Sequence, residues 1–142
     1  MSEKKTNTEG FISRELYDHK TSKLNRECIV VKTADLRGPD NAHHKYVIEC
    51  VIEPQSESEI RQVVERCEIN FQNGGLKDVG PNGITEQALI AIVIDRMRSF
   101  NDGPYGCREN SIMITKLEEA LMWGSKRADD RARRNVEGER IA

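Results

Sequence analysis

Residues 85–134 contain two helical patterns joined by a short turn, and this feature most constrains the fold. Thr85 is a good N-cap residue and Glu86 favours the helix dipole, so a first helix is expected to begin here. The almost unbroken apolar run at 88–94 leaves that helix little polar surface. We therefore expect it to be covered on most of its sides.

A second and longer helix is expected from residues 108–111 toward residue 134, after a tight turn at 100–106. Ile114, Leu117 and Leu121 form its apolar seam. The longer helix has about 25 residues, or roughly 37 Å, against roughly 15 residues for the first. The two patterns predict an αα-hairpin whose end projects past its own core, an arrangement suited to assembly.

The chain before the hairpin predicts a small antiparallel sheet. β-Branched residues fill 28–33 and 45–52, and alternation favours a strand at 67–71. The pattern at 58–66 fits either a helix or a strand. The fold class expected is α+β, with a small N-terminal antiparallel β-sheet followed by a C-terminal long αα-hairpin.

This pattern divides the chain into three parts. Residues 1–26 are polar and without periodicity, which is typical of a flexible arm. Residues 27–83 hold the sheet and a Gly-rich loop, and residues 84–142 hold the hairpin, expected to carry oligomerisation and ligand binding.

Composition limits both the core and the class of partner. The 142 residues include 22 Lys and Arg against 24 Asp and Glu, a net charge of −2, so the chain is no generic DNA or RNA binder. Only 37% are apolar, so burial completed between copies of the chain is expected. The four cysteines form no Cys-x-x-Cys pair, which favours reduced thiols in a cytosol. The longest apolar stretch, 88–94, is too short to span a membrane.

Known catalytic patterns are missing from the sequence. A phosphate-binding loop would need Lys after Gly80, where Pro81 stands. His43 and His44 are adjacent and would face opposite sides of a strand, which disfavours a shared metal. Cys107 at a helix start has no histidine near it in sequence. We therefore expect no catalytic residue, no metal and no cofactor.

The helix starts suit phosphate oxygens better than they suit catalysis. The Gly-rich segment 73–83 leads into the first helix, and Arg108 with Ser111 opens the second. Free N–H groups there, with Arg, Ser and Thr donors, can bind phosphate. Phe71 or Tyr105 could stack on a base. The same residue types also cap helices and turns, so both interpretations stay open.

Residues 69–85, 89–96, 107–123 and 135–138 together resemble one phage-encoded family. It is the anti-Thoeris and anti-CBASS sponge family, named for a shared helical hairpin domain. The resemblance spans 69–139, is fainter at 38–48 and is absent from 1–27. The chain departs from the family at Gly124, where better helix formers are usual, and at Gly106.

The resemblance implies binding without catalysis. Family members hold bacterial immune signalling nucleotides intact, in the host bacterial cytoplasm, so that the defence effector is not activated. Longer members with an N-terminal sheet sequester glycocyclic ADP-ribose, and some also bind CBASS cyclic di- or trinucleotides at separate sites. They assemble as homodimers and often homohexamers. The sheet-plus-hairpin layout is closest to the anti-Thoeris branch.

With this resemblance we assign hypothetical roles to single residues. Phe71 would stack on adenine, Asn73 and Asn82 would hydrogen-bond base or ribose, and Arg96 and Arg98 would meet the pyrophosphate. A separate cyclic-oligonucleotide site would use Arg108, Ser111 and Thr115. The alternative is an oligomerising adaptor that binds a host protein through its hairpin, and a nucleotidase is a third and less favoured possibility.

Overall fold

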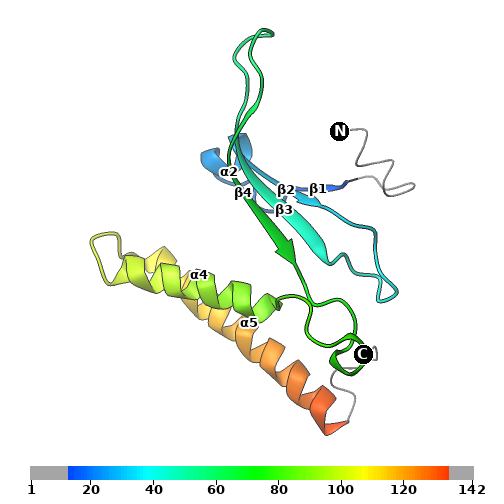
Figure 1. Cartoon of the computed structure of the whole chain (residues 1–142). Helices are drawn as coiled ribbons and strands as arrows, with labels where there is room; N and C mark the ends of the chain where they lie inside the picture. The colour runs from blue at the N-terminus through cyan, green and yellow to red at the C-terminus, as the bar shows by residue number, and fades with distance from the viewer. Residues whose placement is uncertain (1–12, 135–142) are drawn as a thin grey trace. The chain divides into compact units, whose positions relative to one another are not determined.

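The computed structural model describes residues 13–134. They fall into two compact units, divided between Phe71 and Gln72. The first holds a four-stranded antiparallel sheet and the second holds the helical hairpin (Figure 1). The predicted α+β class is confirmed.

In the first unit the strands follow one another in space as they do in sequence, in the order β1-β2-β3-β4. The predicted strands at 28–33 and 45–52 correspond to β2 and β3. The strand predicted at 67–71 is the end of a longer β4, so the open segment 58–66 contributes strand from Gln62. The bounds are β1 Glu15–Leu16, α2 Lys23–Glu27, β2 Ile29–Thr33, β3 Lys45–Ile52 and β4 Gln62–Asn70.

Part of the expected arm is structured. Residues 13–26 form β1 and most of α2, while residues 1–12 lie outside the described residues. Long-range hydrogen bonds hold this segment to β2: the Arg14 N–H donates to Thr33 Oγ1 at 2.9 Å, and His19 Nε2 lies 2.8 Å from the Ile29 carbonyl oxygen. These contacts are not encoded in the local composition that predicted an arm.

The core of the sheet is small and contains a charge. Val47 and Val51 of β3 are buried, and Glu49 between them is only 7% exposed. A buried carboxylate is costly unless it is paired. Arg66 Nη1 donates to Glu49 Oε2 at 2.8 Å, and Lys32 Nζ lies 3.8 Å from its other oxygen. Two cations from the flanking strands therefore compensate this charge.

In the loop between β2 and β3, the carboxylate of Asp40 binds both His44 and the backbone of Ala42. His44 is 5% exposed, and its Nε2 lies 2.8 Å from Asp40 Oδ2. The other Asp40 oxygen accepts the Ala42 N–H at 3.0 Å. A Cβ on Gly38 would come within 3.0 Å of the His44 ring, so glycine lets the loop close over it.

Asp40 makes the stability of the first unit sensitive to acid. The Ala42 N–H, aided by the hydrogen bond from His44, holds the pKa of Asp40 below its ordinary value of 3.8. A lowered folded pKa contributes stability above the unfolded value, and that stability is lost as pH falls through the folded pKa. Because the side chain is 46% exposed, we expect under about 1 kcal/mol.

Urea denaturation at pH 6 and pH 3 checks this expectation. Asp40→Asn should show a smaller loss of stability between the two pH values than the unmodified chain. An equal loss in both proteins would exclude this carboxyl as a source of the acid sensitivity.

The second unit contains α3 Leu76–Val79, α4 Glu86–Asn101 and α5 Arg108–Arg133. The predicted start of the first long helix is confirmed, since Thr85 Oγ1 accepts the Ala88 N–H at 3.2 Å. The single turn of α3 lies in a segment expected to be a loop without any element. Gly80, at φ 72°, ends that turn in a conformation that favours glycine.

Gly124 lies where α4 and α5 approach each other. A Cβ there would come within 2.9 Å of Gln87 Nε2 and 3.4 Å of its Cγ. A larger residue at 124 would therefore require the end of the flexible Gln87 side chain to move, which is a small adjustment. Predicted cover on most sides of α4 is not complete in one chain, where Ile92 is 65% exposed.

Candidate ligand-binding site

The Gly-rich segment between β4 and α4 is closed by the side chain of Gln72. Its amide nitrogen donates to the carbonyl oxygens of Gly74 and Gly80 at 3.1 and 2.9 Å. Its amide oxygen accepts the Asn82 N–H at 2.9 Å, and the Gln72 N–H donates to the Ile84 carbonyl oxygen at 2.9 Å. One polar side chain thus joins the two ends of the loop. Sequence reasoning did not select Gln72, because no local motif marks it.

Asn82 and Asn73 lie side by side in this closed loop. Asn82 Oδ1 accepts the Asn73 N–H at 2.8 Å, and Asn82 Nδ2 donates to the Asn73 carbonyl oxygen at 2.7 Å. The structure therefore brings these two predicted residues together. Both polar atoms of the Asn82 side chain are used in these hydrogen bonds. Asn82 therefore stabilises the conformation of the loop.

Phe71 is the last residue of the first unit and is half-buried. Its N–H donates to the His44 carbonyl oxygen at 2.7 Å, which continues the pairing of β4 with β3. Its ring meets Tyr46 edge-to-face, with centroids 5.8 Å apart and planes at 82°. His43 contacts Tyr46 in turn, with centroids 6.3 Å apart. These two supporting rings were not among the predicted site residues.

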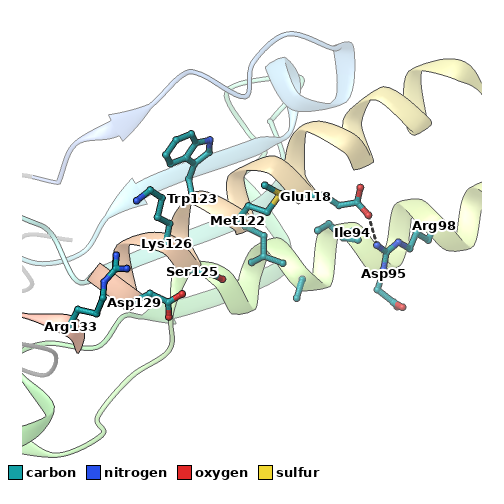
Figure 2. Close-up of a pocket in the computed structure, with 12 residues that line it drawn as sticks. Ile94, Asp95, Arg98, Glu118, Met122, Trp123, Ser125, Lys126, Asp129 and Arg133 are labelled. Carbon is teal, nitrogen blue, oxygen red and sulfur yellow. Dashed lines mark hydrogen bonds and ion pairs between the residues drawn. The ribbon is translucent and has the colours of Figure 1, made fainter. Parts of the chain in front are cut away.

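Arg96 and Arg98 do not converge. Two residues apart on a helix, they are separated by about 200° around its axis. The Arg96 guanidinium lies 4.9 Å from the centroid of the Phe100 ring. Arg98 Nη2 instead donates to Glu118 Oε2 of α5 at 2.6 Å (Figure 2). A single phosphate could be met by one of these side chains but not by both from one face of α4.

Arg108, Ser111 and Thr115 share one face of the first turns of α5, as their spacing of three and four residues requires. Ser111 Oγ accepts from Asn101 Nδ2 at 3.0 Å, and Thr115 Oγ1 donates to the Ser111 carbonyl oxygen at 3.1 Å. The two hydroxyls are thus engaged within the hairpin, and Arg108 is exposed beside them.

A groove of about 900 Å³ runs along the hairpin between α4 and α5 (Figure 2). Its floor contains Ile94, which is 4% exposed, and its rim carries Trp123 and Met122, which are 67% and 68% exposed. Cations and carboxylates alternate along it, with Arg98 already paired to Glu118. The charged lining residues are Asp95, Arg98, Glu118, Lys126, Asp129 and Arg133. Of the predicted site residues only Arg98 lines this groove.

Three further features of residues 13–134 bear on metal sites, thiols and membranes. Among them, no group of three or more His, Cys, Asp or Glu side chains is placed to hold a metal ion. Cys107 is exposed at the N-cap of α5. No helix in this part of the chain is long and apolar enough to cross a bilayer.

Comparison with known proteins finds two similarities. The profile of the Acb2/Tad1 hairpin domain family matches residues 58–129. A protein of Bacillus phage SBSphiJ7 named Thoeris anti-defense 1 is 50% identical over 70 residues. That alignment covers 49% of this chain and 49% of the relative, so it spans about half the length of each.

Proposed function

This chain belongs to the Acb2/Tad1 hairpin domain family, and we propose that it is a phage anti-defence protein that sequesters a cyclic ADP-ribose isomer without cleaving it. The observation that carries the proposal is the match over residues 58–129, which spans β4, the closed loop, α4 and most of α5. The name of the phage relative supports Thoeris as the opposed defence. The proposed ligand is glycocyclic ADP-ribose.

Tight sequestration requires more enclosure than one chain offers. Nanomolar affinity corresponds to about 12 kcal/mol, which a nucleotide-sized ligand reaches only when most of its surface is buried. In one chain the apolar surfaces of the hairpin stay open, with Ile92, Met122 and Trp123 each about two-thirds exposed. Exposed apolar patches of this kind are typical of interfaces. We therefore propose homodimers or homohexamers as the binding form.

Within this proposal Phe71 stacks on adenine. Asn73 and Asn82 act through the closed loop, since Asn82 already uses both of its polar side-chain atoms there. Arg98 and Arg96 are kept as separate phosphate contacts. A cation paired with a carboxylate, as Arg98 is with Glu118, can exchange that partner for a phosphate oxygen.

A second ligand class, the CBASS cyclic di- and trinucleotides, is proposed for Arg108, Ser111 and Thr115. The shared face of these residues at the start of α5 supports one site, because helix N-terminal N–H groups and a guanidinium both attract phosphate.

Ligand recovery tests the function directly. Purified protein is incubated with glycocyclic ADP-ribose, separated from free ligand by filtration and heat-denatured, and the released nucleotide is identified by mass spectrometry. Recovery of about one intact ligand per proposed site is expected. A cleaved product would identify a nucleotidase instead, and no retention would favour the adaptor that binds a host protein.

A further inference from the structure

The outer edge of β4 is a second candidate interface, independent of the hairpin. Within residues 13–71, β4 ends the sheet and pairs only with β3 (Figure 1). Eight of its nine residues are exposed, and Ile69 alone is buried. A long strand edge with uncovered backbone groups is a template for pairing with another strand.

The register with β3 decides which residues face this edge. The Phe71 N–H donates to the His44 carbonyl oxygen, so Phe71 and every second residue before it direct their backbone groups toward β3. Arg66, Glu68 and Asn70 therefore direct their N–H and carbonyl groups outward. A bulge opposite Cys50 and Val51 interrupts the regular register before Glu65.

Arg66 and Glu68 make this edge complementary in charge to the same edge of a second copy. Arg66 Nη1 and Nη2 hold Glu49 and Glu68 at 2.8 and 3.2 Å, so the positive and negative groups have fixed places along the strand. If a second copy pairs antiparallel, Arg66 can lie opposite Arg66, Glu68 opposite Glu68, or Arg66 opposite Glu68. Only the last arrangement places opposite charges across the strands, and it does so twice by symmetry.

We propose that two copies of this chain pair through their β4 edges about a two-fold axis at Cys67. Arg66 of each copy then lies opposite Glu68 of the other, and the two Cys67 residues lie opposite each other. Cys67 falls at a non-hydrogen-bonded position, where Cα atoms are about 4.5 Å apart. The thiol is free and exposed in a single chain. This interface goes beyond the proposed function, since it requires no ligand and no contact between hairpins.

Disulfide trapping tests the register. The full chain is oxidised with copper–phenanthroline at low concentration and run on a non-reducing gel. A covalent dimer is expected, lost in Cys67→Ser and kept in Cys107→Ser, which removes the other exposed cysteine of the described residues. A dimer trapped through Cys107 and not Cys67, or no trapped dimer, would overturn the proposal.

Charge reversal tests the pairing energy in solution. Glu68→Arg places like charges opposite each other at both symmetric positions, so the dimer dissociation constant should rise at least tenfold in sedimentation equilibrium. Glu65→Arg is the matched control, because it makes the same change on the same strand opposite the uncharged Ile69 of the second copy. Circular dichroism checks that both variants fold. Equal dissociation constants for the two folded variants, or a monomeric unmodified chain, would contradict the interface.

Discussion

Replacing Phe71 by alanine is expected to weaken retention of glycocyclic ADP-ribose by about 10- to 100-fold. Stacking of a base on an aromatic ring is worth about 1–3 kcal/mol, and a tenfold change in affinity corresponds to about 1.4 kcal/mol. The edge-to-face contact with Tyr46 holds the ring in one orientation, so little entropy is lost when a base binds. Calorimetric titration of the purified protein measures the change.

Two variants separate stacking from packing. Phe71→Leu keeps an apolar side chain against Tyr46 but removes the aromatic face, so it should lose affinity nearly as much as Phe71→Ala. Tyr105→Ala removes the other aromatic candidate, which is 74% exposed in the turn before α5, and should bind normally. If Tyr105→Ala weakened binding and Phe71→Leu did not, the stacking role would pass to the hairpin turn.

Replacing Arg66 by alanine is expected to lower the free energy of unfolding by about 2–3 kcal/mol. Glu49, 7% exposed in the intact chain, would keep only Lys32, at 3.8 Å, as a neighbouring cation, and removing one partner of a buried pair costs about 3–5 kcal/mol. Our expected value is below that range because Arg66 is partly exposed and because Lys32 still neutralises part of the Glu49 charge. Urea denaturation followed by circular dichroism, at two protein concentrations, separates this effect from any change in assembly.

The same β-hairpin supplies a control. Arg61 pairs with Glu53, and both side chains are about half exposed, so Arg61→Ala should change the stability far less than Arg66→Ala does. Adding Glu49→Gln to Arg66→Ala should recover part of the loss, because it removes the uncompensated charge. Equal costs for Arg61→Ala and Arg66→Ala would show that burial of Glu49 does not determine this pair's contribution.

The helical half of the fold could be predicted because its signals are local. A side-chain cap at Thr85 and 3.6-residue periodicity in 108–134 depend on residues within a turn or two of each other. The segment at 58–66 fitted either a helix or a strand because its residues are not buried in the sheet. Nearly all of β4 is exposed, so burial imposed no clear alternation on its apolar residues.

The candidate site was predictable only in part. The resemblance pointed to the Gly-rich loop, but the closing role of Gln72 depends on carbonyl groups two and eight residues away. The divergence of Arg96 and Arg98 follows from helix geometry and could have been anticipated from their spacing. The partner of Arg98, Glu118, lies twenty residues away and could not.

Sequence alone determined the family, the α+β class and the places where α4 and α5 begin, since caps, periodicity and an ordered motif are all written in neighbouring residues. The tertiary structure decided which polar side chains already have hydrogen-bond or ion-pair partners within the chain. Asn82 turned out to hold its own loop, and Glu49 turned out to be a buried charge between two cations. Those outcomes depend on pairing between segments that are distant in the sequence. A buried polar group without a partner costs free energy, and which groups are buried and paired is decided only when the chain folds.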